Sequence, residues 1–304
     1  MNVFYHKCTV IAVLVGCLLA VGTQGQEPVP RKSRLSASVD YASKYVWRGQ
    51  LLTDGAVLQP AVGIGLDAGT AGSLGLGVWG NMDVDDIAGR EHEMTEYNWN
   101  LYFRPRDMAV ANIPVGVELG TLYYYYPNDG KADDDSDSFE LYVKFFRGNQ
   151  AEKNEAVLKP FLNVYYEGDD INGWYVKGGS SYATRLSDKW GVEAALAAAW
   201  GDSKYNRGYF GLNPNPAGRP AGSDNYYVSD RNWTAARMPS NPRHSGWNDV
   251  TAAIRLLGVI DKNTSTCFSV NFSEIIDSDL ERNADAIYGD SDNFWFAWNI
   301  VATF

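Results

Sequence analysis

The final segment of the chain, residues 293–304, alternates strictly between two kinds of side chain. One set is apolar and mostly aromatic, and the other is mixed. Alternation with a period of two is typical of a β-strand, whose successive side chains point to opposite faces of a sheet. The apolar set is Phe294, Phe296, Trp298, Ile300, Ala302 and Phe304. A face this apolar predicts that one side of the strand meets a solvent other than water.

The same alternation recurs along the rest of the chain, which predicts about twelve strands, with ten or fourteen as alternatives. A strand of roughly 9–11 residues crosses a membrane when it is tilted, and the segments have about this length. The earlier segments are centred on residues 35–41, 58–66, 74–78, 97–104, 115–120, 139–145, 158–167, 174–185, 192–200, 250–255 and 268–274.

The connections between these strands differ on the two sides of the predicted sheet. Connections after odd-numbered strands are longer and more acidic, and they include residues 201–245, whereas most others are short. This asymmetry is typical of outer-membrane barrels, with long loops outside the cell. Unpaired backbone groups are costly in hydrocarbon, so a spanning sheet must close on itself. The sequence therefore predicts an all-β, antiparallel transmembrane β-barrel in one domain, residues 34–304.

The first 25 residues have the layout of a cleaved signal peptide: a short polar head, an apolar run and then small residues. Residues 26–33 would form a short leader. The segment LVGC offers a second interpretation, in which Cys17 is lipidated. Either interpretation predicts export, and together with the barrel it predicts an integral protein of the outer membrane.

Composition excludes some partners. The net charge is −11 and no basic cluster occurs, which argues against nucleic acid. After the signal peptide only Cys267 remains, so the fold does not depend on an internal disulfide. The acidic segment NDGKADDDSDS lacks the order of a calcium-binding loop. We expect no cofactor and no dedicated metal site.

The alternation assigns charged side chains to the inward face, where they are candidates for lining a pore. Two interpretations are open: an ion-pair network that fills the barrel, or a charged water channel. Because acids and bases are nearly balanced, no strong ion preference is expected. The candidates are Asp40, Lys44, Arg48, Glu96, Arg104, Glu118, Glu140, Lys144, Lys159, Glu193, Asp249 and Arg255.

Four aromatic residues are predicted to lie at the membrane interface. If the first strand continues through KYVWRGQ, Tyr45 and Trp47 point outward, at the level of an aromatic girdle. Arg48 then points inward, with Glu96 as its expected partner. Trp298 and Phe304 occupy the outward face of the last strand. A final aromatic strand that ends in Phe304 resembles the signal read by the barrel-assembly machinery.

An enzyme would need a nucleophile or an acid–base pair. His92 lies among several carboxylates in a predicted extracellular loop, where it could serve a hydrolase at the barrel rim. No nucleophile motif such as G-x-S-x-G is present. We therefore predict that the protein is not an enzyme and keep the rim hydrolase as the second alternative.

Residues 40–83 resemble the TorF-type porins, a family of bacterial outer-membrane proteins of largely unknown function. The resemblance rests on the Y-V-W-R-G sequence of residues 45–49, on Gln59 and Pro60, and on WGNMD at residues 79–83. It implies a barrel and a pore, but no particular activity.

Together these features predict a passive, porin-like channel for small hydrophilic solutes. The first alternative is a closed barrel that acts as a scaffold or surface receptor, with the loop at 201–245 as its contact surface. Expected partners are membrane lipid and lipopolysaccharide, the assembly machinery, a small-molecule solute and a second copy of the chain.

Overall fold

The computed structural model describes residues 34–85, 92–110, 113–127, 137–147, 157–169, 171–211 and 242–304. All of them belong to one compact unit, Lys32–Phe304. The predicted signal peptide, the leader and Cys17 lie outside the described residues. So do the acidic segments 86–91 and 128–136 and most of the long loop, residues 212–241.

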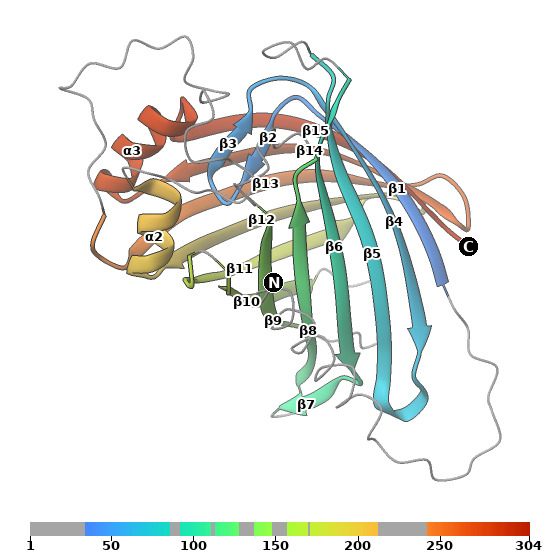
Figure 1. The fold of residues 1–304 in the computed structure, drawn as a ribbon. Coiled ribbons are helices and arrows are strands. Elements are labelled where there is room, and N and C mark those ends of the chain that lie inside the picture. The colour runs from blue at the N-terminus through green and yellow to red at the C-terminus, as the bar shows by residue number, and fades with distance from the viewer. Residues whose placement is uncertain are drawn as a thin grey trace. The chain divides into compact units, whose positions relative to one another are not determined.

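Twelve long strands of the described chain form one closed antiparallel sheet, which confirms the predicted barrel (Figure 1). Each strand pairs with its sequence neighbours, and β1 pairs with β15, so that no edge is left open. The strands are β1 (Arg34–Ala42), β4 (Val57–Asp67), β5 (Gly72–Asp83), β6 (Met94–Pro105), β8 (Ile113–Tyr125), β9 (Ser138–Arg147), β10 (Val157–Glu167), β11 (Trp174–Arg185), β12 (Trp190–Gly201), β13 (Gly246–Val259), β14 (Thr264–Ile275) and β15 (Asp292–Thr303).

The outer face of the ring is apolar. Val62, Leu196, Ile254 and Phe294 are each more than half exposed, and all lie on the predicted outward set. A continuous exposed apolar surface is a liability in water but suits hydrocarbon. Trp298 lies on this face and stacks on Phe268, with ring centroids 5.7 Å apart.

The last residue still takes part in the closing seam of the ring. Phe304 and Leu35 exchange two backbone hydrogen bonds of 2.8 and 3.3 Å, and the Phe304 side chain is exposed. Interface roles for Trp298 and Phe304 stay predictions.

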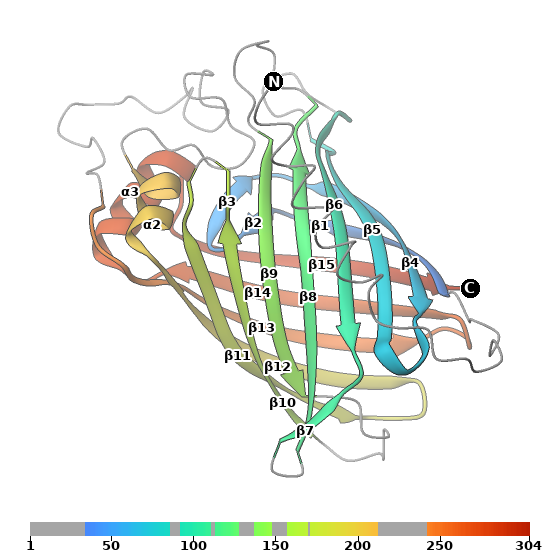
Figure 2. The same ribbon diagram turned by 60° about the horizontal axis from the view of Figure 1, so that its bottom comes forward.

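The first strand does not continue through KYVWRGQ. β1 ends at Ala42, and β2 (Tyr45–Trp47) and β3 (Gln50–Thr53) form a separate two-stranded sheet. Figures 1 and 2 show this hairpin inside the ring. Tyr45 is buried, and Trp47 packs against the barrel's interior side chains. The predicted outward positions of Tyr45 and Trp47 are therefore wrong: their apolar surroundings are an interior core and not the membrane.

The turn of this hairpin requires unusual backbone angles. Arg48 has φ of 50° and Gly49 has φ of 81°, and Trp47 pairs with Gln50 across the turn. Two central residues with positive φ are the mark of a type I′ turn. Gly49 also lies so close to the wall that an added Cβ would be 2.4 Å from Cδ1 of Ile275. Both the angle and the close contact call for glycine here.

Two segments expected to be loops contain helices. α2 (Ser203–Phe210) is capped by Asp202, and α3 (Ser278–Tyr288) is capped by Asp277; each carboxylate accepts hydrogen bonds from two backbone amides of the first turn. Among the described residues, no helix is long and apolar enough to cross a membrane. The remaining short elements are η1 (Gly69–Ala71) and β7 (Met108–Val110), which pairs with β8.

We predict that Gly49→Ala destabilises the protein by more than Gly69→Ala. Both glycines have positive φ, and alanine there costs about 1–2 kcal/mol in each case. Only Gly49 has neighbours within 4 Å, so its alanine adds an overlap of about 1–3 kcal/mol. Thermal unfolding in detergent would measure the difference, and tryptic cleavage after Arg48 would report whether the hairpin leaves the interior. Equal effects of the two substitutions would contradict the close packing of Gly49.

Candidate functional site: the barrel lumen

One mouth of the barrel is filled by side chains from three segments: the β2–β3 hairpin, α2 and α3. We call this assembly the luminal core. α3 contacts both α2 and β3, and Figure 1 shows the two helices together at one end of the ring. The buried residues of the luminal core are Leu51 on β3, Tyr205, Tyr209 and Phe210 on α2, and Leu280, Ala284, Ile287 and Tyr288 on α3; they pack against the wall residues Tyr175, Ala199 and Ile275. An apolar cluster of this size inside a barrel narrows any passage at that end.

Arg48, at the tip of the hairpin, forms the polar centre of the luminal core. Its guanidinium donates two hydrogen bonds of 2.7 Å to the two carboxylate oxygens of Glu140 on β9. The guanidinium carbon also lies 4.3–4.5 Å from the ring centroids of Trp47, Tyr165 and Tyr175. This combines a bidentate ion pair with cation–π contacts, a geometry that lysine cannot reproduce.

Burial is the largest single effect on the pKa of Arg48 and lowers it, but the charge of Glu140, the nearby hydroxyls of Tyr205 and Tyr124 and the hydrogen bonds to Glu140 together hold the pKa well above its ordinary value. The arginine is therefore always charged, and its charge must stay paired. Tyr124 donates a further hydrogen bond of 2.9 Å to Glu140. Removing one partner of a buried ion pair leaves an uncompensated charge, which costs more than the pair contributes.

The predicted partner of Arg48 is wrong. Glu96, on β6, accepts a 3.0 Å hydrogen bond from the hydroxyl of Tyr45 and a 2.7 Å bond from Asn98. Both glutamates lie on the inner face as expected. The hairpin reverses the chain after Trp47, so that Arg48 points toward β9 instead of β6.

A second cluster surrounds Glu118 on β8. Its carboxylate accepts hydrogen bonds from Arg104 at 2.5 Å, from Lys144 at 3.1 Å and from the hydroxyl of Tyr142 at 3.0 Å. Two cations thus share one carboxylate, and both are more exposed than Glu118.

A third group lies on β11–β13. Asp249 accepts hydrogen bonds from Tyr175 at 2.6 Å and from Lys177 at 3.3 Å. Arg255 pairs with Glu193 at 2.6 Å. Lys177 is on β11 and Asp249 is on β13, so this ion pair joins two strands that are separated by β12.

The remaining candidates are more loosely placed. Asp40 lies opposite Asn299 at the β1–β15 seam. Lys44 is outside the wall strands and forms an exposed ion pair of 2.8 Å with Asp54. Lys159 lies opposite Ser181 and is exposed.

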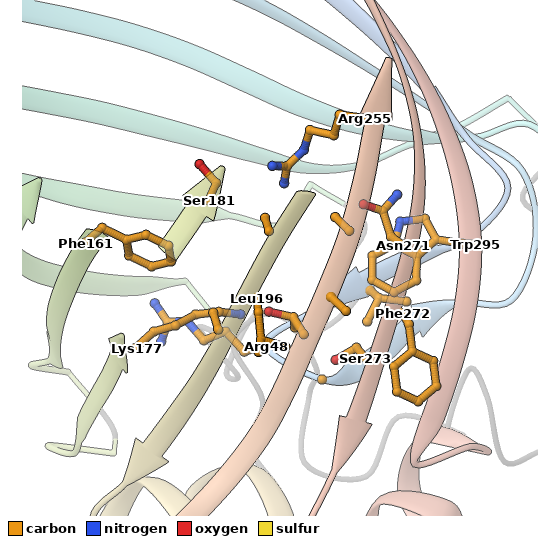
Figure 3. A pocket seen from close by; sticks show the side chains of 17 residues that line it. Arg48, Phe161, Lys177, Ser181, Leu196, Arg255, Asn271, Phe272, Ser273 and Trp295 are labelled. Carbon is orange, nitrogen blue, oxygen red and sulfur yellow. The ribbon is translucent and has the colours of Figure 1, made fainter. Parts of the chain in front are cut away.

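Two cavities open from the lumen within the described part of the chain. One, of about 310 Å³, lies under the hairpin turn and is lined by residues of β10–β15 (Figure 3). The other, of about 350 Å³, is lined by residues of β1, β4, β5, β6, β8 and β15, among them Ser36, Trp79 and Asn100. The inner face therefore encloses space as well as ion pairs.

Sequence reasoning missed the aromatic half of this site and one exposed pair. Tyr205 and Tyr209 are on α2, and spacing of four residues on a capped helix could have indicated a shared buried face. The Nε2 atom of His244, near the start of β13, lies at a hydrogen-bond distance of 3.0 Å from a carboxylate oxygen of Asp277, the N-cap of α3. The Asp277 carboxyl has a pKa below its ordinary value; burial raises it, but bonds from His244 and two helix amides outweigh burial.

The rim hydrolase has little support around His92. The nearby Asp83 is buried, and its carboxylate accepts hydrogen bonds from Thr53 and Asn81. The acidic neighbours at residues 86–91 lie outside the described residues.

Comparison with known proteins gives no family: neither a family model nor a curated protein matches the chain. Solved structures share the barrel architecture only distantly. The KdgM porin in complex with disordered oligogalacturonate is 8% identical, covering 89% of this chain and 99% of that one, with a TM-score of 0.41. The COG4313 outer membrane channel from Pseudomonas putida F1 is 9% identical, covering 93% and 100%, at 0.46. Outer membrane phospholipase A from Escherichia coli is 9% identical, covering 88% and 92%, at 0.43. Likenesses at this level carry no argument about activity.

We predict that Glu140→Gln lowers the free energy of unfolding by about 3–5 kcal/mol, because Arg48 is left buried with its charge uncompensated. Asp54→Asn is the matched control: it removes the same charge from the exposed pair with Lys44, which is worth about 0–1 kcal/mol. Urea unfolding in lipid vesicles, followed by tryptophan fluorescence, would measure both. Similar losses would show that the Arg48–Glu140 pair does not anchor the luminal core.

Proposed function

We propose that the protein is a passive, porin-like channel of the outer membrane for small hydrophilic solutes. The observation that carries the proposal is the enclosed space along the inner face of a closed, apolar-coated barrel. Small inward residues such as Ala195 and Ala253 line one cavity, and Ser36 and Asn100 line the other. Polar and small side chains leave room for water, and barrels of intermediate size lie between filled barrels and open pores.

The luminal core limits what could pass. It occupies the mouth reached by the connections after β1, β12 and β14, which the loop asymmetry assigns to the cell exterior. Solutes would have to pass beside Arg48 and the tyrosines around it. This arrangement supports small solutes in preference to polymers.

The luminal core also favours a second candidate function, a closed barrel that serves as a scaffold or surface receptor. A mouth filled by packed aromatic residues would then be a permanent seal. The segment between α2 and β13, most of it outside the described residues, would supply the contact surface.

Other parts of the proposal follow from the chain's own features. Membrane lipid would contact the apolar outer face, lipopolysaccharide the exposed loops, and the assembly machinery the strand ending in Phe304. Export by a signal peptide, self-association and membership of the TorF-type family, on the motif at residues 45–49, belong to the same proposal. We propose no enzymatic activity.

We expect the purified, folded protein to produce discrete current steps in a planar lipid bilayer. Ala195→Trp should reduce the size of these steps, because Ala195 lines the cavity under the hairpin. The adjacent Ala194 is exposed, and it pairs with the exposed, outward Ile254 and Tyr182. Ala194→Trp is therefore the matched control and should leave the steps unchanged.

A folded wild-type sample without discrete steps would overturn the channel and favour the closed scaffold. Steps that respond equally to both tryptophan substitutions would show that the current does not pass through this lumen.

A further inference from the structure

The cavity under the hairpin has the size of a binding site. Its volume of about 310 Å³ falls at the lower end of the range for small-molecule pockets, about 300–1,000 Å³. Figure 3 shows Phe161 and Ser181 on one side, Asn271 and Trp295 on the other, and Arg255 at one edge. The residues therefore come from several strands and face a common space.

The charged residues lining this cavity are all cations. Arg48, Lys177 and Arg255 line it, and no aspartate or glutamate is among its lining residues in the described part of the chain. Their partners are less exposed: the Lys177 side chain is 22% exposed and that of Asp249 is 0%, while the Arg255 side chain is 36% exposed and that of Glu193 is 15%. Each pair is neutral, but the positive end is the one that a solute meets.

These cations keep donors that their carboxylates do not use. Arg255 donates a hydrogen bond to Glu193 from one of its nitrogens, and Lys177 donates one hydrogen bond to Asp249. A guanidinium has five N–H donors and an ammonium has three. Ser273 is fully buried, lines the cavity, and has a hydroxyl without a hydrogen-bond partner among the described residues. Buried polar groups of this kind are normally satisfied, by water or by a ligand.

The second cavity provides an internal comparison. It is similar in volume, but no charged residue lines it in the described part of the chain; its polar lining consists of hydroxyls and amides such as Ser38 and Asn98. The cationic lining is therefore a property of one place in the lumen and not of the whole inner face. Aromatic rings beside donors, as with Phe161 and Trp295, suit a ligand that has both C–H and polar groups.

We propose that the cavity under the hairpin binds a small hydroxylated carboxylate. Its carboxylate would be held by Arg255 and Lys177 through charge-assisted hydrogen bonds, and its hydroxyls by Ser181 and Ser273. If the protein is a channel, this ligand class is also the class of solute that it carries, and that conclusion rests on the proposed function. The proposed binding does not depend on it.

The test uses isothermal titration calorimetry of the folded, full-length protein in detergent, with gluconate as the probe. Glucose is the neutral probe of similar size. We expect gluconate to bind and glucose to bind at least tenfold more weakly. Arg255→Gln and Lys177→Gln should each weaken gluconate binding about tenfold, the value of one hydrogen bond to a charged group.

Arg185→Gln is the matched control. Arg185 lies on the same strand and inner-face set as Lys177, eight residues further along β11, and does not line the cavity. The Arg185→Gln substitution removes one positive charge, as the other two substitutions do, and should leave the affinity for gluconate unchanged. The proposal is overturned if gluconate does not bind, if glucose binds equally well, or if Arg185→Gln weakens binding as much as the other two. Binding by a protein that is silent in bilayers would overturn only the channel, and conduction without binding would overturn only this site.

Discussion

Backbone amides and carbonyls that face hydrocarbon have no water to bond to, and the closed architecture of this fold follows from that constraint. The sheet has to close, which it does through the β1–β15 and β6–β8 pairings. Closure creates an enclosed inner face, and the chain must line it. It does so in two ways: one mouth is packed with apolar side chains around Arg48, and the wall below carries ion pairs and cavities.

The wall could be predicted because lipid imposes the same period on every strand. Twelve segments found by alternation correspond to the twelve strands of the ring. The same rule failed at residues 45–47, where Tyr-Val-Trp has the alternation of a strand in either surrounding. An apolar pattern reports that a side chain avoids water; it does not distinguish lipid outside the barrel from a core inside it. The positive φ angles of Arg48 and Gly49 turn the chain back into the barrel after Trp47. The dipeptide Arg-Gly did not lead us to expect a turn of this type.

Other parts were present in the sequence but weaker. The segment that forms α3 carries a helix signature: Asp277 at the N-cap, the apolar Leu280 and Ala284 four residues apart, and Gly289 after the last turn. The acidic, loop-like composition of the segment obscured this signature. The Arg48–Glu140 pair could not be found by alternation, because it joins a hairpin to a wall strand 92 residues away. Equal numbers of acids and bases also do not determine which charge is exposed to a solute in the lumen. In the ion pairs of Glu118, Asp249 and Glu193, the cation is more exposed than the carboxylate.

The luminal core spans the seam at which the first and last strands meet. Its hairpin follows β1, whereas α3 lies between β14 and β15, and α3 contacts β3 across the interior. The luminal core therefore links the two sides of the seam. Separating β1 from β15 would also separate Leu51 from Leu280 and its neighbours. Sideways opening of the ring and loss of the interior packing then become a single cooperative event. The seam, which joins the first and last strands of the ring, is reinforced from within as well as by its own hydrogen bonds.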